Sequence, residues 1–250
     1  MVKENVNELV DKLTLFDDDL MSRVFDNNIE ATELMLRIIL GRNINVISVI
    51  GQDEIKSHEV GGRNITLDVH AIDVNGDEID IEVQGNSAGA HIRRARYHSS
   101  MVDSKMLDEG QEFRQLKDSY IIFIYKHDKF RKGLPVYHKD RYIRETEELF
   151  DDGSHIIYVN GNYKGNDEIG QLMNDFRQTD SDKIHYAALA KGVKHFKDTE
   201  KGREQMCEAV EKYAKEYAKE YAKEYAVKEK MISVKNLMEN MKLTVDQACL

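Results

Sequence analysis

The sequence predicts an α/β fold in which a mixed central sheet is flanked by helices. Three observations predict it: apolar residues that alternate strictly around an Asn75-Gly76 turn, two short apolar runs rich in β-branched and aromatic residues, and stretches with helical spacing before, between and after them. A period of two is typical of strands, and a period near 3.6 is typical of helices. Parallel and antiparallel strands are therefore expected in one sheet with helices around it.

Residues 17–41 have helical spacing and predict one or two helices. Their apolar positions are Leu20, Met21, Val24, Phe25, Ile29, Leu34, Leu36, Ile38 and Ile39. Gly41 is well placed to end this segment, because glycine readily adopts the left-handed conformation of a helix C-terminus. Residues 45–50 predict a connector or a short strand, and residues 55–60 lead into the alternating segment.

The alternating segment predicts a half-buried β-hairpin. Its apolar face consists of Ile65, Leu67, Val69 and Ala71 on the first arm and Ile79, Ile81 and Val83 on the second. Its other face carries Asp68, His70, Asp80, Glu82 and Gln84.

The pairing register decides whether the apolar residues of the two arms lie on the same face of the hairpin. Directly opposed residues share a face, and a slip of one residue turns every side chain over. If Asn75 and Gly76 were the whole loop, Asp68 would oppose Val83, and acidic and apolar residues would mix on both faces. A loop with an odd number of residues, or a bulge, avoids this. The expected pairs are then Ala71 with Ile81, His70 with Glu82, and Asp68 with Gln84.

Two apolar runs, at residues 120–125 and 156–159, predict strands buried on both faces, and we expect the first to lie centrally. Helical spacing at residues 88–107, 167–176 and 184–196 supplies the surrounding helices. The inward side of the first of these is expected to include Ile92, Ala95, Val102 and Met106.

Length and composition narrow the class of protein. A chain of 250 residues with 41% hydrophobic and 33% charged residues suits one soluble domain plus an extension. No run approaches the roughly 20 apolar residues of a membrane span, so we expect no membrane partner. The start has no basic region followed by an apolar core, so we expect no secretory signal and a cytoplasmic location. Cys207 and Cys249 lack metal-ligand spacing and are expected to be reduced thiols.

The net charge of −10 argues against indiscriminate binding to nucleic acid. Basic residues nevertheless gather at residues 91–98, whereas acidic residues gather at 17–19 and 147–152. A local basic surface on an acidic protein is therefore expected.

The last part of the chain, from Arg203 onward, is helical in pattern and contains a four-residue Lys-Glu-Tyr-Ala repeat. Pairs such as Glu216 with Lys219 contribute only about 0.2–0.5 kcal/mol each, which is too little to hold an unpacked helix. A self-associating helix that makes a homodimer or higher oligomer is one interpretation, and a single solvated helix is the other. At the end, Thr244 and Gln247 fit a helix start; either the chain is cut short there or its last residues close one turn.

Asp68, followed by Glu82-Val83-Gln84 at the end of the next strand, resembles the core of the PD-(D/E)xK nuclease superfamily, with glutamine where lysine is usual. Together with Arg94-Ala95-Arg96-Tyr97 and the strands at 120–125 and 156–160, the sequence from residue 17 to the end is similar to the bacterial recombination-promoting nucleases, a PD-(D/E)xK transposase family. The resemblance implies a restriction-endonuclease-like sheet in a nuclease-like domain at 1–180, a helical connector at 181–202 and a helical tail at 203–250.

The resemblance also implies hydrolysis of DNA phosphodiester bonds with Mg²⁺ or Mn²⁺. Asp68, Glu82 and the backbone carbonyl of Val83 would be the metal ligands, because Mg²⁺ prefers oxygen. Gln84 would orient a water or a phosphate, although it cannot become a cation as lysine can. Arg94 and Tyr97, three apart on a helix, would bind a DNA phosphate. From the residues alone, a solvated strand face is the more common role for such acids, and an arginine and a tyrosine on a helix are more often solvated or packed than functional.

Four further residues are weaker candidates. Glu30 or Glu33 would complete the metal shell or lie on a solvated helix face. His70 would act as a base or as a neutral cross-strand partner of Glu82. Asp80 would be a solvent-face residue or an acid behind the ligands.

The function expected from these features is that of a metal-dependent DNA endonuclease linked to recombination or mobile elements. The alternative is a catalytically weak or inactive DNA-binding or assembly protein that keeps the nuclease fold, which Gln84 and the acidic net charge favour. A third interpretation is an oligomerisation scaffold that acts through residues 203–250.

Overall fold

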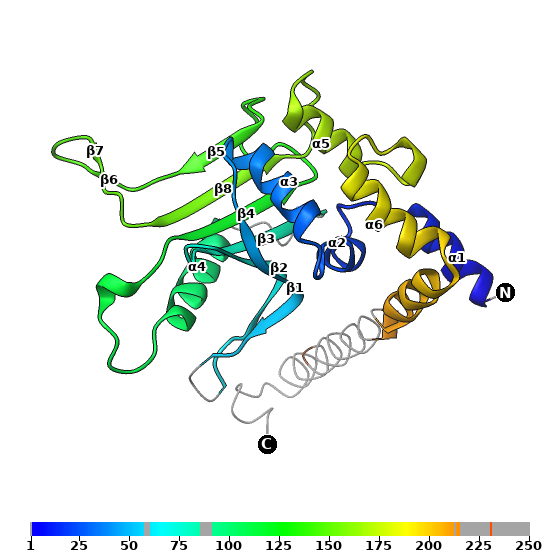
Figure 1. Cartoon of the computed structure of the whole chain (residues 1–250), viewed down its shortest axis with the longest axis horizontal. Coiled ribbons are helices and arrows are strands. Elements are labelled where there is room, and N and C mark those ends of the chain that lie inside the picture. Colours follow the sequence, from blue (N-terminus) through cyan, green and yellow to red (C-terminus); the bar gives the residue numbers. More distant parts are fainter. Residues whose placement is uncertain (1, 58–60, 86–91, 213, 216–230, 232–250) are drawn as a thin grey trace, which may run out of the picture.

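A six-stranded mixed sheet forms the centre of the computed structural model, which describes residues 2–57, 61–85, 92–212, 214–215 and 231 (Figure 1). In spatial order its strands are β1 (Val46–Ile55), β2 (Ile65–Asp73), β3 (Glu78–Gln84), β4 (Ser119–Tyr125), β8 (Ser154–Asn160) and β5 (Val136–Lys139). Strands β3, β4 and β8 are parallel, and the remaining neighbours are antiparallel. The predicted mixed α/β sheet is confirmed, with β4 in its middle.

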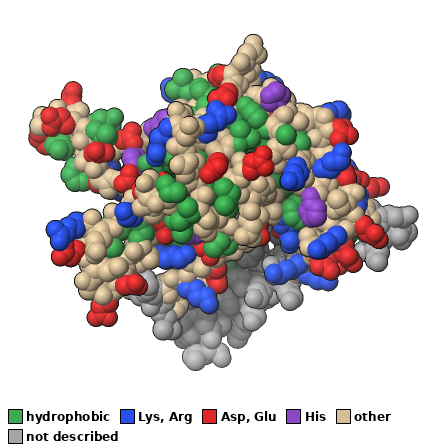
Figure 2. Space-filling view, viewed as in Figure 1, with side chains coloured by type: hydrophobic (Ala, Val, Ile, Leu, Met, Phe, Trp, Pro, Cys, Tyr) green, Lys and Arg blue, Asp and Glu red, His purple; other side chains and the backbone are tan. Residues whose placement is uncertain are grey.

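Helices cover both faces of this sheet (Figure 1). The helices are α1 (Val2–Lys12), α2 (Asp18–Phe25), α3 (Ile29–Leu40), α4 (Ile92–Met106), α5 (Glu168–Phe176) and α6 (Ala187–Asp198), with single 3₁₀ turns at Phe113–Gln115 and Ser181–Lys183. Two short strands, β6 (Tyr142–Ile143) and β7 (Glu148–Leu149), form a separate hairpin. Acidic and basic side chains are intermixed over the face of the molecule shown in Figure 2.

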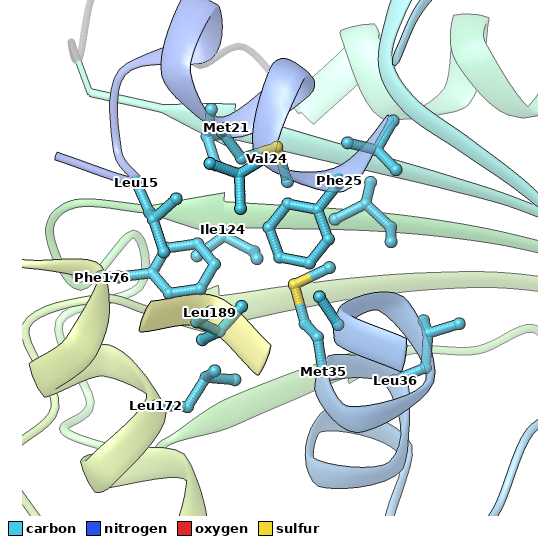
Figure 3. Packing of buried hydrophobic residues seen from close by; sticks show 14 of the residues in the cluster. Leu15, Met21, Val24, Phe25, Met35, Leu36, Ile124, Leu172, Phe176 and Leu189 are labelled. Carbon is cyan, nitrogen blue, oxygen red and sulfur yellow. The ribbon is translucent and has the colours of Figure 1, made fainter. Parts of the chain in front are cut away.

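The larger core lies between the sheet and helices α2, α3, α5 and α6 (Figure 3). Phe25, Met35, Leu172 and Phe176 are fully buried there against strand residues such as Ile124. The predicted helical segment at 17–41 is two helices, and α3 ends at Gly41 as predicted: its φ is 66° and its N–H bonds to the carbonyl of Arg37.

The second core lies on the other face, under α4. Ala95 and Val102 of α4 pack there on Phe123 and Tyr125, and Met106 is partly buried against them. The prediction for Ile92 was wrong: its side chain is 55% exposed, because it lies at the first residue of the helix as the structure describes it. Met101 is buried on this side of α4.

The polar face of the hairpin is buried, which corrects the prediction of a half-buried hairpin. His70, Asp80 and Glu82 are each at most 2% exposed, and Asp68 is 8% exposed. The reason is tertiary: α4 packs over this face, so β2 and β3 are covered on both sides. The expected solvent-face position of Asp80 is therefore wrong.

The hairpin register has the predicted parity but differs from the expected pairs by two residues. Val69 pairs with Ile81, His70 with Asp80 and Ala71 with Ile79. The loop is short because the Asp73 carboxylate accepts hydrogen bonds from the backbone N–H groups of Asn75 and Asp77, at 2.8 and 3.0 Å. This register places Asp68 level with Glu82 and not with Gln84.

One further prediction differs from the structure, and others are not tested by it. The expected connector or short strand at 45–50 is a ten-residue strand, β1, because it pairs along the whole of β2. Most of the predicted tail and its repeat, including the helix start at Thr244, lies outside the described residues, and the domain boundaries at 180 and 202 stay predictions. In the described parts of the chain, no helix has the length and apolarity that a membrane crossing requires.

Candidate active site

Strand β2 changes faces at Asp68. Ile65 and Leu67 pack in the core under α4, whereas Val69 and Ala71, which continue the same alternation, pack in the opposite core. The paired strand is irregular at the same level: Gly51 pairs with Val69 and Asp53 with Leu67, and Gln52 between them has a φ of 55°. The prediction that Ile65, Leu67, Val69 and Ala71 share one face was therefore wrong. The change of face places Asp68 where the regular pairing between β2 and β3 ends, which leaves a gap between the two strands.

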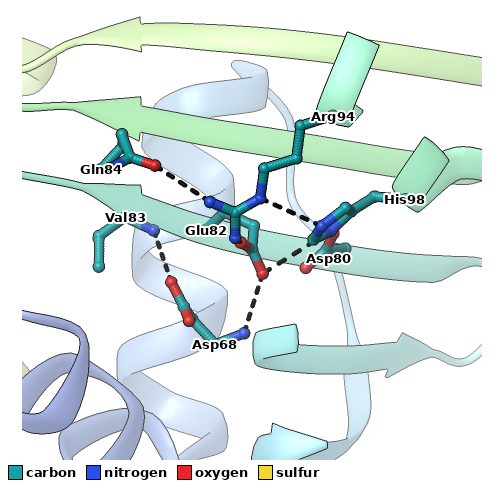
Figure 4. Close-up of polar contacts among 7 residues, drawn as sticks. All are labelled: Asp68, Asp80, Glu82, Val83, Gln84, Arg94 and His98. Atoms are coloured by element: carbon teal, nitrogen blue, oxygen red, sulfur yellow. Dashed lines mark hydrogen bonds and ion pairs between the residues drawn. The ribbon is translucent and has the colours of Figure 1, made fainter. Parts of the chain in front are cut away.

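Asp68 and Glu82 bridge this gap through each other's backbones (Figure 4). The N–H of Asp68 donates to Glu82 Oε1 at 3.0 Å, and the N–H of Val83 donates to Asp68 Oδ2 at 2.9 Å. The regular pairing of β2 with β3 ends one residue earlier, at Val69 and Ile81. Asp68, Glu82 and Val83 are thus brought together as expected, and their roles as metal ligands stay predictions.

A third acid and a histidine complete the cluster on the α4 side. Asp80 lies two residues before Glu82 and is fully buried. His98 Nδ1 of α4 is 2.8 Å from Asp80 Oδ2 and 3.8 Å from Glu82 Oε1. One potential ligand atom from each of Asp80, Glu82 and His98 lies within 4.8 Å of the other two. Within the described ranges, Asp80 Oδ1 is the buried side-chain polar atom that has no hydrogen-bond partner.

Arg94 joins these groups from the first turns of α4 (Figure 4). Its guanidinium forms an ion pair with Glu82 and donates to Gln84 Oε1 at 3.0 Å, and its Nε donates to His98 Nε2 at 3.3 Å. The guanidinium also lies 5.5 Å from the centre of the Phe123 ring. The Arg94 side chain is 37% exposed, so it forms the outer boundary of an otherwise buried cluster.

Burial dominates the electrostatics of the cluster. Burial and the charge of Asp68 raise the pKa of Asp80 to about 8, and burial and the charge of Asp80 raise the pKa of Glu82 to about 8. Burial, followed by the charge of Glu82, raises the pKa of Asp68 well above its ordinary value. Burial lowers the pKa of His98, which favours the neutral imidazole. Three carboxyl groups therefore share one permanent cation, Arg94, among the residues described around them.

The remaining expected residues lie apart from the cluster. Tyr97 donates from its hydroxyl to the backbone carbonyl of Arg63 at 2.7 Å and is 37% exposed. It borders a hollow of about 620 Å³ that is also lined by Arg63, Arg93 and Arg94. This hollow reaches His98, so it adjoins the acidic cluster.

His70 is not the partner of Glu82 that the sequence suggested. It is paired with Asp80 in the register, and its ring lies between Asp53, 2.7 Å from Nδ1, and Glu78, which contacts Nε2. Burial lowers the pKa of His70, but its bonds with Glu78 and Asp53 outweigh burial and raise it overall. The correct register accounts for the difference, because it shifts His70 by two residues away from Glu82.

The acids expected from the first helical segment also lie elsewhere. Glu33 accepts a hydrogen bond from the N–H of Val46 at 2.9 Å, and Glu30 is exposed on α3. Asp18, in the first turn of α2, is the acid of this segment whose charge acts on Asp68 and raises its pKa. Sequence reasoning missed Asp18 because its approach to β2 is a tertiary contact.

Two members of the cluster had signals in the sequence. Asp80 precedes Glu82 by two residues, so strand alternation places them on one face. His98 follows Arg94 by four residues, so a helix places them on one side. What the sequence does not reveal is that these two faces meet.

The chain matches a family model described as PD-(D/E)XK nuclease family transposase over residues 26–235. No curated protein and no solved structure matches the sequence significantly. The match spans most of the chain and includes the whole sheet and helix α4. The expected resemblance is confirmed: this chain belongs to the PD-(D/E)XK nuclease family transposases.

Proposed function

We propose that this chain is an Mg²⁺- or Mn²⁺-dependent DNA endonuclease. The observation that carries the proposal is the burial of three carboxyl groups, Asp68, Asp80 and Glu82, around one guanidinium, with Asp80 Oδ1 left without a partner. Buried carboxylates are costly unless protons or cations balance them. Because the chain belongs to a nuclease family, we propose that a divalent cation balances the charge of these carboxylates.

The residues fit such a cation. Asp80, Glu82 and His98 place potential ligand atoms within 4.8 Å of one another, and Asp80 has an unpartnered oxygen. Asp68 would supply a further carboxylate from β2. When bound, the cation supplies a more acidic water and offsets charge on the phosphate oxygens. The backbone carbonyl of Val83 remains a proposed ligand. The backbone N–H of Val83 orients Asp68 by donating to its carboxylate.

Arg94 and Gln84 are proposed to do the work that a motif lysine does elsewhere in the superfamily. Gln84 accepts a hydrogen bond from Arg94 and so holds the guanidinium over Glu82. A guanidinium presents donors in a fixed fork that matches phosphate oxygens. Arg94 would therefore bind the phosphate next to the carboxylates, and Gln84 would position Arg94.

Cleavage of supercoiled plasmid by the purified chain tests this proposal. With Mg²⁺ or Mn²⁺ the plasmid should be nicked or linearised, and EDTA should stop the reaction. Asp68→Asn and Glu82→Gln keep the side-chain shapes and should each lower the rate by at least about 100-fold. Glu112→Gln is the control, because its side chain is 62% exposed at the N-cap of a 3₁₀ turn. Unchanged cleavage in both site variants would overturn the proposal.

One observation favours a second candidate, a DNA-binding or assembly protein without turnover. The guanidinium of Arg94 forms an ion pair with the Glu82 carboxylate in this structure. If that ion pair is permanent, it takes the place of the divalent cation at Glu82. Calorimetry with Mn²⁺, with and without DNA, separates the two. Salt-sensitive DNA binding without any metal binding would favour this second function.

We further propose a role for this endonuclease in recombination or at mobile elements, and its assembly into a homodimer. The family description as transposases supports action on DNA during recombination or at mobile elements. A double-strand break needs two sites, so we retain a homodimer formed through the tail at 203–250, following the nuclease-like domain at 1–180 and the connector at 181–202. The mass of the full chain in solution, compared with that of a chain ending before residue 203, tests this arrangement.

A further inference from the structure

We propose that the hollow between α4 and β5 binds an unstacked nucleobase of the DNA substrate, so that this chain prefers DNA with an unpaired nucleotide beside the cut. The inference rests on the proposed nuclease function and specifies its substrate. The hollow, named here the base pocket, has a volume of about 720 Å³. Its apolar wall is formed by Phe130, Tyr137, Tyr158 and Ile156, and its rim by Arg93, Arg96, Lys139 and Arg141. Pockets for small ligands typically enclose about 300–1,000 Å³, so one nucleotide fits.

Aromatic rings line the base pocket in a connected group. The Phe130 ring packs edge-on against Tyr137 at 4.9 Å and against Tyr158 at 5.2 Å between centroids. Phe130 is nevertheless 39% exposed, so part of this large apolar ring faces the pocket or solvent. Every base has a face that stacks on an aromatic ring, which makes such a ring a sequence-tolerant base contact.

The loop that carries Phe130 is held in place by one side chain. The Asp128 carboxylate accepts hydrogen bonds from the N–H groups of Phe130, Arg131 and Gly133, at 3.1, 3.0 and 2.7 Å. It also accepts one from the Tyr137 hydroxyl at 2.8 Å. Both Phe130 and Tyr137 are therefore positioned before any ligand arrives, which lowers the entropy cost of binding.

The charges at the rim suit phosphate. Arg93, Arg96 and Lys139 are exposed there, and Asp140 is the acid among the lining residues. Arg141 is ion-paired with Asp152, which lies outside the lining. A basic rim on a chain of net charge −10 is a local feature, and it complements the phosphates on either side of a bound base.

The base pocket lies beside the candidate active site, because one residue borders both. Arg93 lines both the base pocket and the smaller hollow beside Arg94 and His98. A strand whose phosphate lies at Arg94 would therefore pass Arg93 and deliver a neighbouring nucleotide to the pocket. Unstacking a base costs least where it is already unpaired, so mismatched, bulged or single-stranded DNA should be preferred.

Binding of labelled DNA hairpins to the full chain in EDTA tests the inference without requiring cleavage. One hairpin is fully paired, and the other carries a single unpaired 2-aminopurine, whose fluorescence falls when it stacks on a protein ring. We expect the bulged hairpin to bind about tenfold more tightly and its fluorescence to be quenched. Phe130→Leu should abolish both effects, whereas Phe130→Tyr, which keeps the ring, should retain them.

Matched controls distinguish the loss of a base contact in the pocket from the loss of an exposed ring elsewhere or from unfolding. Phe113→Leu changes a phenylalanine that is 90% exposed on a different segment, and it should alter neither effect. Thermal unfolding of each variant shows whether it is folded. Equal affinity for the two hairpins, or a bulge preference that survives Phe130→Leu in a folded protein, would overturn the base pocket. Failure of the nuclease proposal appears separately, as plasmid cleavage that is absent or insensitive to Asp68→Asn and Glu82→Gln.

Discussion

Strand β3 has two faces that are equally buried and chemically opposite. Ile79, Ile81 and Val83 enter the large helical core, while Asp80 and Glu82 point under α4, and both acids are 0% exposed. Burial of the first face stabilises the fold in proportion to its apolar area. Burial of the second face costs free energy unless partners, protons or cations balance its charges. The contrast indicates that one face stabilises the fold, whereas the other carries the acids of the proposed site.

The largest effect on stability is expected on the apolar face. Ile81→Ala removes a fully buried side chain and should lower the free energy of unfolding by about 2–5 kcal/mol, with little dependence on pH. Urea denaturation measures the change, and Val74→Ala, at a position that is 55% exposed, should stay within about 0.5 kcal/mol of the original protein. A loss below 1 kcal/mol for Ile81→Ala would contradict this assignment of the faces.

On the polar face, a divalent cation should stabilise the fold. At pH 8 and about 100 times its dissociation constant, Mn²⁺ should raise the free energy of unfolding by about 2.7 kcal/mol. The gain should shrink at pH 5, because protons then compete for the carboxylates. Denaturation with and without Mn²⁺ measures it. An equal gain in Glu82→Gln would show that the ion binds elsewhere.

The pH dependence of stability should distinguish the two faces further. The folded protein keeps a proton on Asp80 up to a pKa of about 8, whereas the unfolded chain releases it near 3.8. The folded state therefore binds more protons in this window, and stability should fall as the pH rises through it. Asp80→Asn keeps an oxygen for the contact with His98 and removes the titration.

In EDTA we expect Asp80→Asn to be more stable than the original protein by about 1–3 kcal/mol at pH 8.5, with a smaller difference at pH 5. Thermal unfolding across this pH range tests it. Asp140→Asn, at an exposed position, serves as the control and should follow the original pH profile. A pH profile of Asp80→Asn that parallels the original would show that Asp80 does not titrate in this window.

The smallest effect is expected at the outer edge of the polar face. Gln84→Ala removes the acceptor that positions Arg94 and should cost about 1 kcal/mol. Gln84→Glu restores an acceptor with a charge and should be at least as stable as the original protein at neutral pH. Urea denaturation of the pair checks both. Equal losses in the two variants would mean that the contact with Arg94 contributes nothing.

Much of this architecture was predictable from local patterns. Alternation located β2 and β3, the apolar run at 120–125 located the central strand β4, and Gly41 located the end of α3. The motif residues Asp68 and Glu82 were also correctly expected to converge. These features depend on residue spacing within a single element or hairpin, which the sequence displays directly.

The details that failed depend on contacts between distant segments. The hairpin register differs by two residues because Asp73 closes a short loop that alternation alone does not specify. His70 consequently meets Asp53 and Glu78 instead of Glu82. Asp18 acts on Asp68 although 50 residues separate them, because α2 packs across the sheet.

By itself, the sequence determined the class of fold, the strands that carry the acids and the parity of the hairpin pairing, because periodicity is a local property of the chain. Only the tertiary structure decided that α4 covers the acidic face and brings Arg94 and His98 onto Asp80 and Glu82. Burial changes the energy of a charge far more than any neighbour in sequence does. For that reason, the candidate site could be located from the sequence, whereas its electrostatics required the fold.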